Sequence, residues 1–417
     1  MRIALLTYST KPRGGVVHTL NLAEALTRLG ADTTVWTLGR GGDGAFFRPV
    51  EPGVTIRVVP FEGLEGEAVG PRIMRSINVL RDAFRPSDYD IVHAQDCISA
   101  NAVGRCIRTI HHLDTFTTPE LASCHERAVV EPYARICVSA AVAEEVHAGW
   151  GLRPTVIPNG VEYERFATAA GDFAEAVMAR AGWQRRLGRY VLALGGIEPR
   201  KGSLDLLEAF ALLRRNHLNL HLVFAGGETL FDYRDYRSRF HDRAAELGIR
   251  PTILGTVPHP DLPALMASAA MVPFFSTKEG FGLAAMEALA AGIPVVARDL
   301  PVLREVFGDT VQYAVSPVDM AAGMSHALAT DPSRAERGKA LAALFSWDRA
   351  ARAHLDFYRA HPADLPDRTL ATHLRAGENM DPNPAQIHSV DSARVPWALL
   401  AEQTSANIPV KPLCSER

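Results

Sequence analysis

The segment RIALLTYSTKPRGGVVHTLNLAEALTRLGADTTVWTL, residues 2–38, decides the fold class. It begins with a short apolar run, passes through a loop rich in proline and glycine, and then places apolar residues at helical spacing over residues 17–29. Gly30 is the residue type that commonly follows a helix, and residues 33–38 carry the β-branched and aromatic side chains that favour a strand. The segment therefore predicts a strand, a helix and a second strand, which is the repeating unit of a parallel α/β sheet.

The same alternation continues along the chain. Further short apolar runs in the first half predict a parallel sheet covered by helices on both faces. These runs are residues 56–59, 91–94, 108–111 and 136–139. The second half repeats the scheme between residues 190 and 297. We therefore predict an α/β fold with two doubly wound, Rossmann-like sheets, in which ligands bind beyond the carboxyl ends of the strands.

The length of 417 residues also indicates more than one domain, because single cores stop growing at about 250–300 residues. We predict a first domain over residues 1–165 and a second over residues 188–345. Residues 346–360 have the apolar spacing of an amphipathic helix, which we expect to pack back towards the first domain. Residues 361–417 are rich in Pro, Ser, Asn and Asp without sustained periodicity, which predicts a poorly structured tail.

Composition excludes several classes of function. The net charge of −3 provides no basic field for a nucleic acid, so we expect no nucleic-acid partner. The N-terminal apolar run is too short for a signal peptide or a membrane span, which favours a cytoplasmic protein without a transmembrane segment; peripheral membrane contact stays open. The five cysteines are scattered without close pairing, which indicates reduced thiols.

The segment EGFGLAAME, residues 279–287, is the most informative for chemistry. It falls between a predicted strand and a predicted helix. Gly280 and Gly282 let backbone N–H groups approach an anion, and the helix N-terminus adds about half a positive charge, so a diphosphate would be stabilised there. Glu287 could accept both hydroxyls of a ribose. The alternative, two solvated glutamates, is disfavoured by the combined context of glycines, small helical residues and a following apolar strand.

This segment is similar to the E-x7-E motif of the family 4 retaining glycosyltransferases, and the resemblance extends over roughly residues 1–358. It implies a GT-B fold, two Rossmann-like domains facing across a cleft. It also implies a nucleotide diphosphate sugar as donor, transfer with retention, and no metal ion or other cofactor. Glu279 would lie near the donor sugar, and Glu287 would hold the nucleotide ribose.

A second segment, GGIEPRKG at residues 195–202, places two cations before a helix. Arg200 and Lys201 would stabilise the departing diphosphate, the task that metal ions perform elsewhere. The alternative is a solvated basic turn. The resembling family usually has an arginine five residues before the lysine, where this chain has Gly196. Lys201 matches the family, and whether Arg200 replaces the missing arginine stays open.

The first domain offers two further candidate segments. Gly14 and Gly15 follow the first strand, and their amides could meet the donor phosphate, although an ordinary tight turn explains two glycines nearly as well. His111 matches the histidine of a T-[IV]-H pattern that, in the resembling family, points at the sugar. His112 and Asp114 are candidate acceptor contacts.

Together these inferences define the predicted site. The residues assigned to catalysis are His111, Arg200, Lys201 and Glu279. Those assigned to donor binding are Gly14, Gly15, Gly280, Phe281, Gly282, Leu283 and Glu287. No metal ligands are assigned, because the spacing of the histidines and Asp114 does not support a zinc site.

Two further motif matches are not supported by the sequence around them. Residues 39–44 fit G-x-G-x-x-G literally, but no helix pattern follows, so we interpret them as a glycine-rich loop. Residues 88–90 have the D-x-D spacing of metal-using glycosyltransferases, yet they precede the strand that they should follow.

The sequence thus predicts a retaining transferase that moves a hexose-type sugar from a nucleotide diphosphate sugar to a small-molecule, glycan or lipid acceptor. Two alternatives stay open, because a fold does not determine its chemistry. One is a nucleotide-sugar epimerase or phosphorylase of the same fold, and the other is an inactive protein that binds sugar nucleotides. The sequence does not identify the nucleotide base, the sugar or the acceptor.

Overall fold

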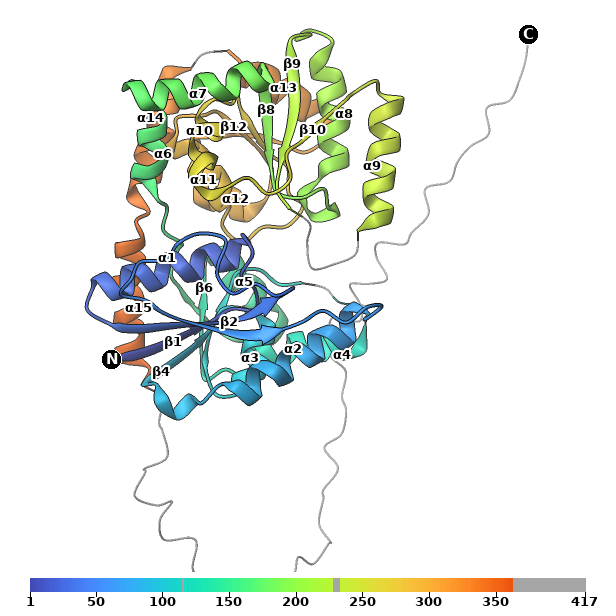
Figure 1. Cartoon of the computed structure of the whole chain (residues 1–417). Coiled ribbons are helices and arrows are strands. Elements are labelled where there is room, and N and C mark those ends of the chain that lie inside the picture. Colours follow the sequence, from blue (N-terminus) through green and yellow to red (C-terminus); the bar gives the residue numbers. More distant parts are fainter. Residues whose placement is uncertain (115, 117, 228–232, 330, 363–417) are drawn as a thin grey trace, which may run out of the picture.

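The chain folds into two α/β bodies, which lie one above the other in Figure 1. The computed structural model describes residues 1–114, 116, 118–227, 233–329 and 331–362. The predicted tail lies outside these residues from position 363 onwards.

The first domain is built on one seven-stranded parallel sheet with the order β3-β2-β1-β4-β5-β6-β7. Its strands are β1 (Arg2–Leu6), β2 (Asp32–Arg40), β3 (Thr55–Phe61), β4 (Ile91–Ala94), β5 (Ile107–Ile110), β6 (Ala134–Cys137) and β7 (Thr155–Val156). The covering helices are α1 (Gly14–Arg28), α2 (Val69–Ala83), α3 (Cys97–Val103), α4 (Pro119–Val130) and α5 (Ala140–Trp150). The strand order reverses between β1 and β4, the position where ligands bind in such sheets.

The second domain repeats this order. Its strands are β8 (Arg189–Leu194), β9 (Leu220–Ala225), β10 (Thr252–Ile253), β11 (Val272–Phe274), β12 (Val295–Arg298) and β13 (Gln312–Ala314). They pair as β10-β9-β8 and β11-β12-β13. The N–H of Leu192 donates to the carbonyl of Met271 at 3.0 Å, which joins β8 to the start of β11. The result is one doubly wound sheet, as predicted.

Helices cover both faces of this second sheet. They are α8 (Ser203–Arg214), α9 (Arg234–Glu246), α10 (Leu262–Ala267), α11 (Leu283–Ala290), α12 (Pro301–Phe307), α13 (Pro317–Ala327) and α14 (Pro332–Leu344). The alanine-rich stretch at the predicted boundary forms two more helices, α6 (Tyr163–Ala169) and α7 (Ala174–Leu187). Both pack against α10, so this stretch belongs with the second domain rather than forming an open linker.

The chain crosses between the domains twice, at adjacent positions. The N–H of Val161 donates to the carbonyl of Phe345 at 2.9 Å, which holds the two crossings together. After the second crossing, α15 (Trp347–Ala360) runs down along the first domain and packs against α1 (Figure 1). Its buried face contributes Trp347 and Tyr358 to the core of the first domain. The last described helix therefore ties the end of the second domain back to the first.

The sequence predicted the fold class and most of these strands correctly, with shifts of a few residues at their ends, but it did not predict β7 or β13. Two local interpretations were wrong. The helix α1 begins at Gly14 rather than Val17, and Gly39 and Arg40 belong to the end of β2 rather than to a loop. Among the described residues, no helix combines the length and the apolar character needed to cross a bilayer.

We predict that Tyr358→Phe lowers the free energy of unfolding by about 1–3 kcal/mol, because a buried polar group loses its partner. The Tyr358 hydroxyl lies 2.8 Å from Nδ1 of the fully buried His93, whose Nε2 lies 2.7 Å from Thr109 Oγ1. Urea unfolding measures the change. The control Arg359→Met, at an exposed position on the same helix, should stay within about 0.5 kcal/mol of the parent. Equal stabilities for Tyr358→Phe and the parent would contradict the role of this buried contact.

Candidate functional site

The segment at residues 279–287 forms the loop after β11 and the first turns of α11. Gly282 precedes α11 with φ of 94°, a left-handed conformation that glycine adopts without strain. A side chain at Gly282 would also meet the ring of Phe307, because an added Cβ would lie 2.9 Å from it. Phe281 is buried in the core of the second domain, and Leu283 begins the helix. Local backbone geometry and packing therefore account for the glycine at position 282.

Lys201 and Arg200 converge on one oxygen of Glu279. Lys201 Nζ lies 2.7 Å from Glu279 Oε1, and an Arg200 guanidinium nitrogen lies 3.3 Å from the same atom. The N–H of Thr277 donates a hydrogen bond of 2.7 Å to the carbonyl of Arg200, which holds the loop after β11 beside the loop after β8. Burial alone would raise the pKa of Glu279, but the two cations outweigh it and lower the pKa to about 2. Glu198 Oε1 also lies 3.4 Å from an Arg200 guanidinium nitrogen, so the cluster pairs two cations with two carboxylates.

Glu287 lies in an electrostatic environment opposite to that of Glu279. Burial, together with the nearby carboxylate of Glu162, raises its pKa to about 8 against the opposing effect of Arg165. Arg165 pairs with Glu162 at 3.0 Å, at the start of α6 where the chain enters the second domain. The carboxyl group of Glu287 is therefore protonated for much of the neutral pH range.

The first domain meets this loop at His111, which follows β5. Gly280 packs so closely on the His111 carbonyl that an added Cβ would lie 1.5 Å from the oxygen. Gly15, in the first turn of α1, lies against the imidazole, where an added Cβ would be 3.6 Å from the ring. Gly14 begins the same helix with open space around it. The structure thus brings Gly15, His111 and Gly280 together across the domain interface.

Buried polar groups hold the imidazole of His111 in place. Its Nε2 lies 3.3 Å from Gln95 Oε1, and its ring centroid lies 4.7 Å from that of His18. Burial lowers the pKa of His111 well below its ordinary value, and the charges of His18 and Arg108 lower it further. His111 is therefore a neutral hydrogen-bonding group at physiological pH.

The other histidines and the aspartate near His111 differ in how deeply they are buried. His112 Nε2 pairs with Asp114 Oδ1 at 3.2 Å on the accessible side of the loop, and the charge of Asp114 reaches Arg200 of the other domain. His93 instead lies fully buried between Thr109 and Tyr358, so it belongs to the core.

Several contacts at the interface were missed from the sequence. The carboxylate of Glu305, in α12, accepts hydrogen bonds from the backbone N–H groups of Ala140 and Ala141 at 2.7 and 2.8 Å. It thereby caps the N-terminus of α5 in the other domain, which a negative charge stabilises. Gln95, Glu162 and Arg165 were missed as well. None of them stands in a motif, and only the fold brings them to the site.

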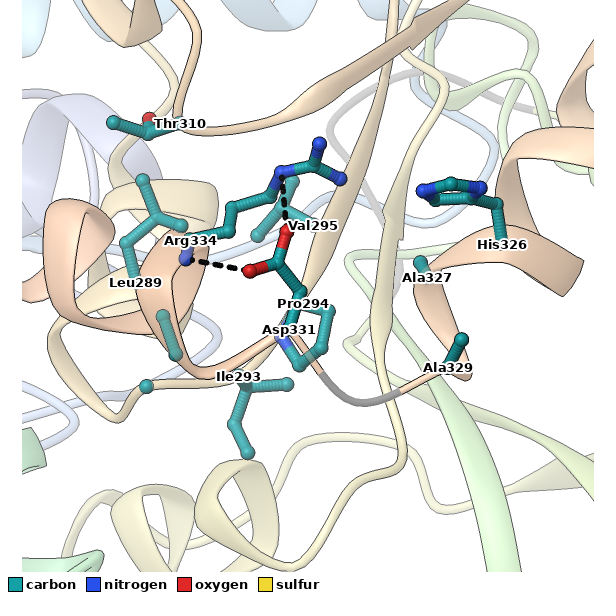
Figure 2. Close-up of a pocket in the computed structure, with 12 residues that line it drawn as sticks. Leu289, Ile293, Pro294, Val295, Thr310, His326, Ala327, Ala329, Asp331 and Arg334 are labelled. Atoms are coloured by element: carbon teal, nitrogen blue, oxygen red, sulfur yellow. Dashed lines mark hydrogen bonds and ion pairs between the residues drawn. The ribbon is translucent and has the colours of Figure 1, made fainter.

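A small pocket in the second domain lies away from this site (Figure 2). Leu289, Pro294 and Val295 line it, at the C-terminal end of α11 and the start of β12. It lies at the opposite edge of the sheet from Gly282, and its volume of about 30 Å³ suits a water molecule rather than a nucleotide. Asp331 is hydrogen-bonded there to the N–H of Arg334 at 3.0 Å, as the cap of α14.

Comparison with known proteins identifies the family. Residues 12–165 match the family described as Glycosyltransferase Family 4, and residues 185–341 match Glycosyl transferases group 1. A D-inositol 3-phosphate glycosyltransferase of Geodermatophilus obscurus is 30% identical over 87% of this chain and 90% of its own length. The chain belongs to glycosyltransferase family 4. It is also 28% identical to the O-antigen chain mannosyltransferase B of Escherichia coli, over 68% of this chain and 78% of that protein.

Solved structures agree on the fold. Anabaena HepE in complex with UDP and glucose superposes with a TM-score of 0.68 at 21% identity, covering 86% of this chain and all of that one. Sucrose-phosphate synthase of Thermosynechococcus elongatus gives a TM-score of 0.69 at 20% identity, over 86% of this chain and 98% of that one. This family 4 chain is therefore a GT-B glycosyltransferase of the group that uses nucleotide sugars.

We predict that Gly280→Ala lowers kcat/KM for sugar transfer by about 100-fold, the scale expected when reacting groups are displaced by 1 Å. The added methyl group would collide with the His111 carbonyl and push the domains apart. Nucleotide affinity should change little, because the cations lie within the second domain. Steady-state kinetics and calorimetry measure the two effects separately. Gly182→Ala, where nothing lies within 4 Å of an added Cβ, is the matched control. A fully active Gly280→Ala enzyme would show that the close approach does not matter.

Glu287→Gln should change the pH dependence of stability. The pKa of Glu287 is raised in the folded state. Its contribution to the free energy of unfolding is therefore fully present below about pH 4.5 and is lost as pH rises through about 8. Glutamine mimics the neutral carboxyl, so the variant should gain stability relative to the parent between pH 5 and pH 9, by up to about 1.4 kcal/mol per pH unit. Urea unfolding at several pH values tests this. A stability difference that does not vary with pH would contradict it.

Proposed function

We propose that this protein transfers a hexose from a nucleotide diphosphate sugar to an acceptor bound on the first domain, with retention of anomeric configuration. The observation that carries the proposal is the convergence of Lys201 and Arg200 on one oxygen of Glu279. The retaining outcome and the hexose rest on family membership, and the residue roles below rest on the geometry.

The cationic pair would stabilise the leaving group. When the bond between the anomeric carbon and the diphosphate oxygen breaks, its electron pair and negative charge pass to the diphosphate. The two cations at Glu279 are positioned by loop contacts before any donor arrives, so they stabilise that charge without reorganising. Since Arg200 reaches the same carboxylate oxygen as Lys201, we assign it the task that Gly196 cannot perform.

Glu287 would bind the ribose. Ribose hydroxyls that donate to its carboxylate favour the charged form, which lowers the pKa from its raised value. We therefore infer that donor binding releases a proton from Glu287 in neutral solution. The residues at the start of α11 include small ones, so the N-terminus of this helix stays accessible to the diphosphate.

The first domain would contribute His111 and the start of α1. A neutral imidazole at His111 can hydrogen-bond a hydroxyl of the donor sugar. The acceptor hydroxyl then attacks the anomeric carbon from the face that the diphosphate leaves, and its proton passes to a diphosphate oxygen. This step forms one carbon–oxygen bond and breaks another without a protein nucleophile or a metal ion.

The two alternatives are weaker. The relatives found are named as glycosyltransferases, and none of those reported above is named as an epimerase. Against an inactive binding protein, the loop that carries Glu279 contacts His111 of the other domain through Gly280. We place the reaction in the cytoplasm, because the described cysteines are free thiols, as expected in a reducing compartment.

We predict that Lys201→Met lowers kcat by about 10²–10³-fold, the range seen when a single group that stabilises transition-state charge is removed. The donor KM should rise by much less. Lys339→Met removes a lysine from α14, far along the chain from the loop of Lys201, and should leave both constants unchanged. NMR of the product tests retention directly, and donor consumption without acceptor tests for an epimerase. An inverted product or an unaffected Lys201→Met enzyme would contradict the proposal.

A further inference from the structure

His18, in the second turn of α1, lies where three parts of the chain meet. Its side chain is buried, and Nδ1 of its ring lies 2.8 Å from Oδ1 of Asn159. The centroid of its ring lies 4.7 Å from that of His111 and 5.3 Å from that of Trp347. One buried imidazole therefore contacts both chain crossings and the histidine at the domain interface.

Asn159 and Trp347 belong to the two crossings between the domains. Asn159 stands in the first crossing, and Trp347 begins α15 in the second. Gly160, which follows Asn159, packs so closely on the second crossing that an added Cβ would lie 2.4 Å from the backbone nitrogen of Trp347. The two crossings thus form one packed unit, and His18 joins this unit to α1 of the first domain.

His18 also packs against the imidazole of His111. It stands three residues after Gly15 on α1, so both residues lie on one face of the helix. Gly15 leaves room for the ring of His111, and Gln95 Oε1 lies 3.3 Å from Nε2 of that ring. The end of β4 and one face of α1 therefore hold the imidazole, and His18 links it to the first crossing through the bond to Asn159.

The bond between His18 and Asn159 determines the protonation of the His18 ring. Because an amide oxygen only accepts hydrogen bonds, His18 carries a proton on Nδ1. Burial, together with the charge of His354, lowers the pKa of His18 to about 3 against the opposing effect of the bond to Asn159. His18 is therefore neutral at physiological pH, and its directional hydrogen bond suits it to hold its neighbours in place rather than to exchange protons.

We propose that His18 is a positioning residue for the transfer reaction, which fixes the imidazole of His111 relative to the chain crossings and thereby relative to the second domain. The inference rests on the proposed role of His111 at the donor sugar, and it adds a residue that acts through His111. The carbonyl of His111 already contacts Gly280 of the second domain. His18 fixes the ring of the same residue, so that backbone and side chain are both held against the donor loop.

Two substitutions separate the two contacts of His18. His18→Phe keeps a ring beside His111 but removes the donor to Asn159, whereas His18→Asn keeps a donor near the position of Nδ1 but removes the ring. Each should lower kcat by about 10–100-fold, the scale expected when reacting groups are displaced by about 1 Å. Turnover is measured as release of nucleoside diphosphate from UDP-, GDP- and ADP-linked hexoses, with the donor that the parent uses fastest. Calorimetry should show little change in nucleoside diphosphate affinity, because the cations lie in the second domain.

His354 provides the matched control. It is fully buried on α15, and its Nε2, like that of His18, has no hydrogen-bond partner within the described part of the chain. Its Nδ1 lies 2.8 Å from the carbonyl of Ala350, so this contact stays within one helix. His354→Phe and His354→Asn should shift the midpoint of urea unfolding about as much as the His18 variants do, but they should leave kcat unchanged.

A double substitution tests whether His18 acts through His111. His111→Ala should lower kcat, and adding His18→Asn to it should cause little further loss, because residues that act as one unit have non-additive effects. Asn159→Leu removes the hydrogen bond from its other partner and should reproduce the loss seen in His18→Phe. This variant also measures the bond if a His18 variant fails to fold.

Full kcat in folded His18→Phe and His18→Asn proteins would overturn the proposal. A loss of kcat in the His354 variants equal to that in the His18 variants would overturn it too, since it would reflect a loosened core. The same holds for a full further loss when His18→Asn is added to His111→Ala, which would show that His18 acts elsewhere. A failure of the proposed function is seen separately, as unchanged kcat in His111→Ala or as absence of donor turnover by the parent.

Discussion

The shared contact of Lys201 and Arg200 with one carboxylate oxygen of Glu279 is the interaction on which the rest of the site depends. It joins the loop after β8 to the loop after β11, and both loops face the first domain. Glu279 and Glu198 both pair with these cations, so a bound diphosphate would compete with two carboxylates for them. Glu287 adds little negative charge, because burial and Glu162 raise its pKa to about 8. The second domain therefore holds both a pair of cations and a neutral carboxyl group, which the proposed binding of a diphosphate joined to a ribose would use.

The position of the first domain follows from this arrangement. Gly280, next to Glu279, contacts the His111 carbonyl, so the cations and the histidine are brought into one space. The carboxylate of Glu305 fixes the same interface by capping α5, and α15 returns along the first domain after the second crossing. The contact between the two domains, the cations that would stabilise the leaving group and the histidine that would contact the sugar thus belong to one connected set of residues. A change at any of these contacts should alter transfer more than it alters the folding of either domain.

Much of the fold could be predicted from the sequence, because each strand and helix carries its own local pattern. The run at residues 2–38 already specifies the βαβ unit, and the second half repeats it. The paired glutamates and the adjacent cations could also be found, since each stands in a short segment with glycines. The motif did not reveal the raised pKa of Glu287, which depends on residues more than a hundred positions away.

The central claim is that Lys201 and Arg200 bind the donor diphosphate without a metal ion. Calorimetric titration of the full chain in the presence of EDTA, with a nucleoside diphosphate and the corresponding monophosphate, tests it most directly. UDP, GDP and ADP are screened first to select the base. The account predicts that the diphosphate binds at least about tenfold more tightly than the monophosphate, as expected when a phosphate gains a charge-assisted contact, and that Lys201→Met removes most of this difference. Equal affinities, or a preference that appears only after a divalent cation is added, would contradict it.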